Sequence, residues 1–208
     1  MKIFNKILII ILVIFHLIGV IGMLVGNQAE FAQLSWLNLL ISTVIALVSY
    51  KRKLYLYLTP FLIVVLFSFF IEVIGVKTSL LFGSYYYGSA LGIKVLEVPV
   101  LIGFLWLTLS IGAKSIVLRI KGLPKVFVFL FSSALLFSID YLMEPIAVKL
   151  NFWTWTNGQI PVYNYICWFI FAFINQLFLK NVTTRNIVVE VLFLINGSSI
   201  MFIFFGNI

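Results

Sequence analysis

The chain has 208 residues, of which 63% are hydrophobic and only 10% are charged. An ordinary soluble domain carries about 25% charged residues, so this composition excludes a soluble enzyme and a disordered scaffold. The net charge of +8 would suggest nucleic acid in a soluble protein. Here the basic residues lie between apolar segments, where they set membrane topology, and no nucleic-acid partner is expected.

Seven apolar segments approach the length of about 20 residues that a membrane-spanning helix needs. They cover residues 3–25, 35–50, 54–76, 96–113, 126–148, 160–179 and 187–206. The first follows basic residues, as a signal peptide does, but its apolar run is longer than a typical signal core, so we expect an uncleaved anchor. The segments predict an all-α polytopic membrane helix bundle of about seven transmembrane helices, forming a single domain over residues 1–208.

The basic residues divide unevenly between the two ends of these segments. With the N-terminus inside, 11 of the 14 basic residues lie in inner segments, and only Lys77, Lys94 and Lys149 lie in outer ones. Positively charged loops stay on the cytoplasmic side of a membrane. The pattern predicts a multi-pass protein of the cell membrane, in contact with the lipid bilayer, with its N-terminus inside and its C-terminus outside.

Cysteine and histidine each occur once, as Cys167 and His16. A lone cysteine excludes an internal disulfide, and the two residues are too few for a zinc-type site. We expect no metal and no cofactor. His16 is expected to hydrogen-bond a neighbouring helix, and Cys167 to pack.

Two long connections, at about 77–95 and 149–160, fall on the predicted outer side and carry many aromatic residues. Aromatic side chains also form belts at membrane interfaces, but this density near glycines also fits the mouth of a lipid-accessible pocket. The candidate wall residues are Tyr85, Tyr86, Trp153 and Trp155 of these connections, together with Trp168 of the following segment.

Three of the six acidic residues have ordinary explanations. Glu30 and Glu97 lie at segment ends, where water reaches them, and Glu190 lies near the inner end of the last segment, where Arg185 is a candidate partner. None of these three needs a functional interpretation.

The other three acids, Glu72, Asp140 and Glu144, lie within apolar segments. Asp140 and Glu144 are four residues apart and so share one helix face. An acid within a span is costly and usually faces the bundle interior. Burial disfavours the charged form of a carboxyl group, and a neutral carboxyl group in a dry pocket is a competent general acid. Alternatively, the acids only hydrogen-bond Asn, Tyr or Ser across helices; Asn164 and Trp168, also four apart, are candidate partners.

Two groups of residues stand in a specific order and spacing along the chain. The first group consists of Glu72, Gly75, Phe82 to Tyr87, Leu91-Gly92, Val98-Pro99 and Trp106. The second group consists of Asp140, Glu144-Pro145, Trp153-Thr154-Trp155, Pro161, Asn164 and Trp168. Together the two groups span nearly half of the chain, and they resemble the CruF-type carotenoid hydratases, a family also called carotenoid biosynthesis protein.

The resemblance implies addition of water to the terminal C1′=C2′ double bond of an acyclic carotenoid, which gives a tertiary alcohol. Relatives act on γ-carotene, lycopene or bisanhydrobacterioruberin, and other enzymes of that pathway are candidate partners. We predict Asp140 as the acid, with Glu144 or Glu72 as its partner or base. The predicted substrate-binding residues are Phe82, Tyr85, Tyr86, Trp153, Trp155, Asn164 and Trp168.

Four other functions remain to be weighed against hydration. A lycopene-cyclase-type enzyme uses the same protonation, but an internal alkene captures the cation. A transporter would use buried acids to relay protons, and a carotenoid-binding or assembly protein would use none of this chemistry. A retinal protein is excluded, because the segment 187–206 has no lysine for a Schiff base.

Overall fold

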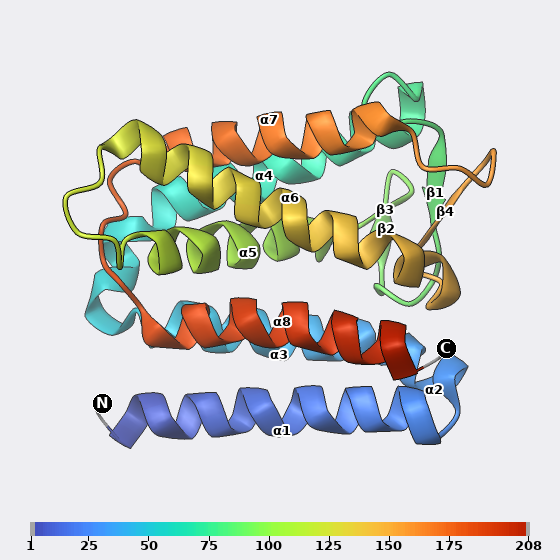
Figure 1. The fold of residues 1–208 in the computed structure, drawn as a ribbon, viewed down its shortest axis with the longest axis horizontal. Helices are drawn as coiled ribbons and strands as arrows, with labels where there is room; N and C mark the ends of the chain where they lie inside the picture. Colours follow the sequence, from blue (N-terminus) through green and yellow to red (C-terminus); the bar gives the residue numbers. More distant parts are fainter. Residues whose placement is uncertain (1–2, 207–208) are drawn as a thin grey trace.

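The computed structural model describes residues 3–206, and seven long helices lie at the seven predicted apolar segments (Figure 1). The prediction of an all-α bundle is therefore confirmed. In chain order the elements are α1 (Ile3–Val25), α2 (Gln28–Gln33), α3 (Ser35–Ser49), the 3-10 turn η1 (Lys51–Lys53), α4 (Leu54–Thr78), β1 (Tyr85–Tyr87), β2 (Lys94–Val95), β3 (Val98–Pro99), α5 (Ile102–Val117), α6 (Lys125–Lys149), β4 (Trp153–Trp155), α7 (Val162–Phe178) and α8 (Ile187–Gly206).

Among the described residues, four stretches of helix are long and apolar enough to cross a membrane: α1, the continuous stretch of η1 and α4 (Lys51–Thr78), α6, and α8. The other three, α3, α5 and α7, are apolar but have only 15, 16 and 17 residues. At 1.5 Å per residue each is about 23–26 Å long, slightly less than the roughly 30 Å of a bilayer core. The protein thus has several helices able to span a membrane, and seven spans stay a prediction.

The helices run back and forth between two ends of the bundle (Figure 1). α1 lies at one edge beside α3 and α8, and α4 and α7 lie at the opposite edge. α5 is the central helix: it packs against α3, α4, α6, α7 and α8, and most of its residues are buried. α4 and α5 approach each other closely at Gly103, where an added Cβ would lie 2.4 Å from the backbone oxygen of Val65, so only glycine lets the two helices meet here.

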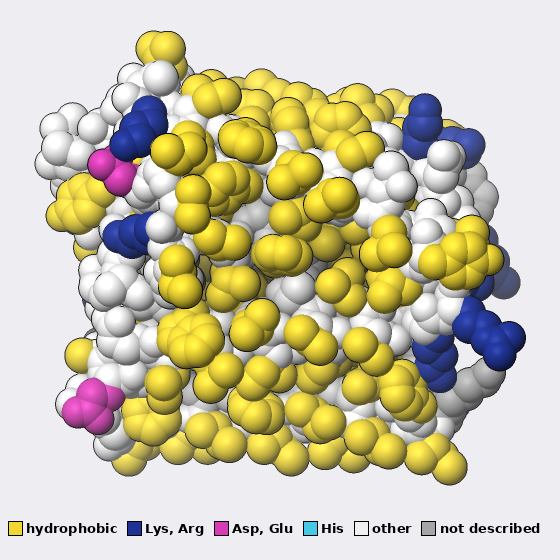
Figure 2. All heavy atoms as spheres, turned by 180° about the vertical axis from the view of Figure 1, so that it is seen from behind, with side chains coloured by type: hydrophobic (Ala, Val, Ile, Leu, Met, Phe, Trp, Pro, Cys, Tyr) yellow, Lys and Arg dark blue, Asp and Glu magenta, His cyan; other side chains and the backbone are white. Residues whose placement is uncertain are grey.

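The outer surface of the bundle is apolar along the helices and charged at the ends. Many large hydrophobic side chains of α1, α4 and α8 are exposed, as expected for helices that face lipid. Figure 2 shows one face of the bundle, which is apolar along its length, with Lys and Arg gathered at one end and a mixture of basic and acidic side chains at the other. The N-terminus lies at one end and the C-terminus at the other (Figure 1). The side of the membrane on which each end lies stays a prediction.

Two small antiparallel ladders cap the end of the bundle near the C-terminus (Figure 1). β2 and β3 form a tight hairpin whose two turn residues, Leu96 and Glu97, both have positive φ, 53° and 71°. A two-residue turn of this kind is the one that fits the twist of paired strands. The predicted span beginning at residue 96 therefore starts too early, because the chain turns here and α5 begins only at Ile102.

Candidate functional site

The two aromatic connections pair with each other through the strands β1 and β4. Tyr85 lies opposite Trp155, and Tyr87 lies opposite Trp153. Because alternate side chains of a strand point to opposite faces, these four rings share one face, and all four are more than nine-tenths buried. Tyr86 points the other way and is 55% exposed. The ladder thus closes the end of the bundle with a layer of aromatic rings.

Beneath this layer, Glu72 of α4 is buried and receives three hydrogen bonds. The hydroxyls of Tyr85 and Tyr87 donate to its Oε2 at 2.5 and 2.8 Å, and Nε1 of Trp106 donates to its Oε1 at 2.9 Å. Burial first, and then the neighbouring Glu72, raise the pKa of both phenols well above the ordinary value. Both tyrosines therefore keep their protons and act as donors at neutral pH.

Gly75, one turn after Glu72, makes room for this arrangement. An added Cβ at Gly75 would lie 2.9 Å from the ring of Phe82 and 3.0 Å from the hydroxyl oxygen of Tyr85. Phe82 is 2% exposed and packs edge-on against Tyr85, with ring centroids 6.2 Å apart. A side chain at this position would push the tyrosine away from the carboxyl group.

Glu144 of α6 receives a second set of three hydrogen bonds. Nε1 of Trp153 and Nε1 of Trp155 donate to its Oε2 at 3.1 and 2.8 Å. Nδ2 of Asn164, from α7, donates to its Oε1 at 3.1 Å. Both carboxyl groups that face the aromatic layer thus accept three hydrogen bonds each.

Asp140, one turn before Glu144 on α6, is different. The same Nδ2 of Asn164 donates to its Oδ2 at 3.2 Å, so one side chain of α7 contacts both acids. The side chain of Asp140 is fully buried, and its Oδ1 has no hydrogen-bond partner within residues 3–206. A buried oxygen without a partner is rare and calls for an explanation.

Hydrogen-bond complementarity distinguishes the three carboxyl groups. The two oxygens of a carboxylate offer about four acceptor sites, and protonation takes one of them. Glu72 and Glu144, with three donors each, keep one such site, while Asp140 has a whole oxygen, Oδ1, with room for a proton. Within residues 3–206, no Lys or Arg forms an ion pair with any of the three.

A small cavity lies between the acids and the aromatic layer. Its volume is about 20 Å³, slightly more than the roughly 10–15 Å³ that one water molecule needs. Trp168 also lines it and stacks on Trp106, with centroids 4.0 Å apart and planes 15° apart. The residues that line it are Glu72, Phe82, Tyr85, Tyr87, Glu144, Trp153, Trp155, Asn164 and Trp168.

Most of the residues predicted from the sequence as site residues meet at this cavity, and Asp140 lies one hydrogen bond behind it at Asn164. The structure does not bring Tyr86 to the cluster. Tyr87 and Trp106 contact Glu72 but are not among the predicted site residues. A strand period of two over residues 85–87 would have selected Tyr85 and Tyr87 together.

The acids with ordinary explanations lie away from this cluster. Glu97 pairs with Lys77 at 2.8 Å on the surface. Glu190 is buried and pairs with Arg119, with Arg185 at 4.0 Å. Glu30 accepts a hydrogen bond from the side chain of a neighbouring asparagine.

His16 meets Asn196 of α8 at 3.1 Å, which is the helix–helix contact expected for it. In the part of the chain that the structure describes, no three or more His, Cys, Asp or Glu side chains are arranged to hold a metal ion.

Comparison with known proteins identifies the family. Residues 33–206 match the family model described as carotenoid biosynthesis protein. No curated protein and no solved structure matches the chain. The match includes α3 to α8 and the whole carboxyl and aromatic cluster. The chain therefore belongs to the carotenoid biosynthesis protein family.

Proposed function

We propose that this protein adds water to the terminal C1′=C2′ double bond of an acyclic carotenoid of the lycopene, γ-carotene or bisanhydrobacterioruberin type. The observation that carries the proposal is the difference among the three buried acids. Two of them accept three hydrogen bonds each, and Asp140 keeps an unpartnered oxygen. Hydration of an alkene needs both a neutral acid and a proton-accepting carboxylate, in a site that excludes bulk water.

Asp140 is the proposed acid. Its O–H bond breaks as a C–H bond forms at C2′, and the π electrons of the alkene leave a tertiary cation at C1′. An isolated alkene is a very weak base, so the acid must not be engaged by a better acceptor. The unpartnered Oδ1 of Asp140 meets that requirement, because no protein group competes for its proton.

The aromatic layer and the two carboxylates are the proposed stabilisers of the cation. Trp153 and Trp155 are the best rings for this purpose, since a desolvated cation over an indole face gains about 2 kcal/mol or more. Glu72, which lines the same cavity, adds negative charge.

Water in the cavity then attacks C1′, a C–O bond forms, and the proton released from the water goes to Glu144. Asn164 contacts both Glu144 and Asp140, so the proton returns over a short path to Asp140 as the alcohol leaves. No proton is consumed over the cycle, and neither step uses a metal ion or a redox cofactor.

The test is co-expression in cells that accumulate lycopene or γ-carotene, followed by chromatography and mass spectrometry of the pigments. We expect a product heavier by one water molecule with almost the same visible spectrum, because the terminal alkene lies outside the conjugated system. A new pigment of unchanged mass would instead establish cyclisation or isomerisation. No new pigment from protein that is folded in the membrane would contradict an enzymatic role on these substrates.

Asp140→Asn tests the assignment of the acid. Loss of a general acid lowers turnover by about 10²–10⁴-fold, while bound carotenoid should remain, because the amide keeps the shape of the side chain. Glu97→Gln is the matched control, since this acid is exposed and outside the cluster, and it should change neither measurement. Full activity in Asp140→Asn would overturn the assignment.

A further inference from the structure

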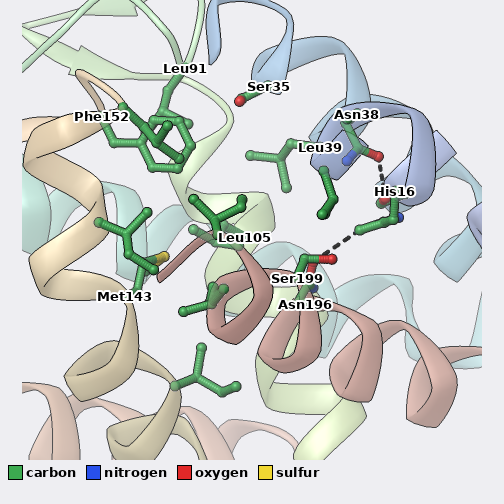
Figure 3. Close-up of a pocket in the computed structure, with 18 of the residues that line it drawn as sticks. His16, Ser35, Asn38, Leu39, Leu91, Leu105, Met143, Phe152, Asn196 and Ser199 are labelled. Atoms are coloured by element: carbon green, nitrogen blue, oxygen red, sulfur yellow. Dashed lines mark hydrogen bonds between the residues drawn. The ribbon is translucent and has the colours of Figure 1, made fainter. Parts of the chain in front are cut away.

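A second and larger cavity lies next to the carboxyl cluster. It has a volume of about 140 Å³ and is lined by α1, α3, α5, α6 and α8 (Figure 3). Trp153 lines both this pocket and the small cavity at Glu144. Ile139 and Met143, the residues just before Asp140 and Glu144, face the larger pocket. The two cavities therefore lie on either side of α6 and share one indole as a wall.

The small cavity cannot hold a substrate end group by itself. Its 20 Å³ fits about one water. By contrast, an apolar cavity of about 150 Å³ holds a benzene-sized molecule. The 140 Å³ of the larger pocket therefore suits about five or six carbon atoms, the size of one branched isoprene unit.

The chemistry of the lining also favours hydrocarbon. On the side of α6, Leu91, Leu105, Met143 and Phe152 form an apolar wall (Figure 3). Besides Thr108, which donates to the backbone oxygen of Leu105, four of the polar side chains of the pocket form hydrogen bonds within the protein. The ring of His16 is hydrogen-bonded to the side chain of Asn196 and to the backbone oxygen of Leu12, one turn earlier in α1.

The remaining two of these four, Ser42 and Asn38, are hydrogen-bonded to each other. These groups do not require a polar ligand, and hydrocarbon next to them leaves their hydrogen bonds intact.

We infer that this pocket binds the terminal isoprene unit of an acyclic isoprenoid chain, with Trp153 as the wall that separates it from Glu144. Rotation of that indole breaks its 3.1 Å hydrogen bond to Glu144 and joins the two cavities. The rest of the chain lies outside the pocket, along the apolar helices. The inference rests on the proposed function for the reacting end group, but binding of the chain is measured without turnover.

Gly19 of α1 gives a direct way to fill the pocket. It lines the pocket, and an added Cβ would meet nothing within 4 Å. Gly19→Phe therefore places a ring in the space assigned to the isoprene unit. In lycopene-accumulating cells, we expect the purified variant to carry about tenfold less lycopene per protein than the wild type, with a matching loss of any product.

Ile18→Phe is the matched control, because Ile18 is the neighbouring residue and is 55% exposed on the lipid side. It should keep wild-type pigment content. If Gly19→Phe does not fold, Ser199→Leu fills the same pocket from α8 and should have the same effect.

The outcomes separate the two proposals. A wild type that binds lycopene without hydrating it, and loses it in Gly19→Phe, would reject the hydration and support the pocket. Hydration and pigment content unchanged in both pocket-filling variants would reject the pocket and leave the hydration standing. A wild type that carries only phospholipid acyl chains would also overturn the pocket assignment.

Discussion

Replacing Glu72 or Glu144 by glutamine tests how the hydrogen bonds around each buried glutamate contribute to stability. The side chains are nearly the same size, so the change removes charge and turns one acceptor oxygen into an NH₂ donor. At Glu72, two of the three donors are the hydroxyls of Tyr85 and Tyr87, both on Oε2. A hydroxyl can rotate to accept, so the new NH₂ can take the Oε2 position while Trp106 keeps its acceptor.

The surroundings of Glu144 do not allow this. Both donors on Oε2 are indole N–H groups, from Trp153 and Trp155, and an indole cannot accept. If the NH₂ group takes the Oε1 position instead, it faces the NH₂ group of Asn164, which donates to both acids through the same nitrogen. The amide of Asn164 must then turn over, so that its NH₂ group loses both Glu144 and Asp140 as acceptors. At least one buried donor therefore loses its acceptor, which costs about 1–3 kcal/mol.

We therefore expect Glu144→Gln to be less stable than Glu72→Gln by about 1–3 kcal/mol. For a chain of this length each kcal/mol lowers the melting temperature by about 2–4 °C, so the expected difference is roughly 2–12 °C. The assay is thermal unfolding of both purified variants in one detergent, followed by tryptophan fluorescence. Equal melting temperatures, or a larger loss in Glu72→Gln, would refute the reasoning from rotatable hydroxyls and fixed indoles.

Three further predictions follow from the packing and the charges. Gly103→Ala should lower the melting temperature strongly, because its Cβ would lie 2.4 Å from a backbone oxygen of α4. Gly19→Ala should be tolerated, because its Cβ would meet nothing within 4 Å. Thermal unfolding of the two variants compares these effects. Tyr87→Phe should leave the near-ultraviolet phenolate signal unchanged up to about pH 10, because the raised pKa of Tyr87 keeps it protonated there; loss of part of the signal below that pH contradicts the burial argument. Arg119→Ala removes the partner of a buried glutamate of α8 and should cost about 1–3 kcal/mol, against about 0–1 kcal/mol for Lys77→Ala at an exposed pair; equal losses in denaturation would contradict this ranking.

The sequence predicts the helices well because their signal is local. Each long apolar run forms a helix, since a helix satisfies its own backbone hydrogen bonds in a dry environment. The start of α5 is the exception: residues 96–101 are apolar enough to extend the helix, but the turn at Leu96 and Glu97 stops it. A hairpin of two-residue strands leaves no periodic pattern to recognise.

The aromatic ladder is the part of the site that the sequence does not reveal. Tyr85 and Trp155 are neighbours in space but are far apart along the chain, and a run of three tyrosines has no alternation from which to choose a face. Tyr86 is therefore predicted as a wall residue although it points outward, and Tyr87 is missed. The spacing of Asp140 and Glu144, by contrast, places both acids on one face without knowledge of the fold.

The parts of the chain before and after the connection of α5 to α6 each supply the complete set of donors for their own glutamate. Tyr85, Tyr87 and Trp106 surround Glu72 in the part before it, and Trp153, Trp155 and Asn164 do the same for Glu144 in the part after it. A protein divided at Gly122, in the exposed connection between α5 and α6, would therefore keep each glutamate in the same fragment as all three of its hydrogen-bond donors. Two separately translated fragments should reassemble in the membrane, with β1 of one fragment paired with β4 of the other. Recovery of activity would measure this reassembly directly.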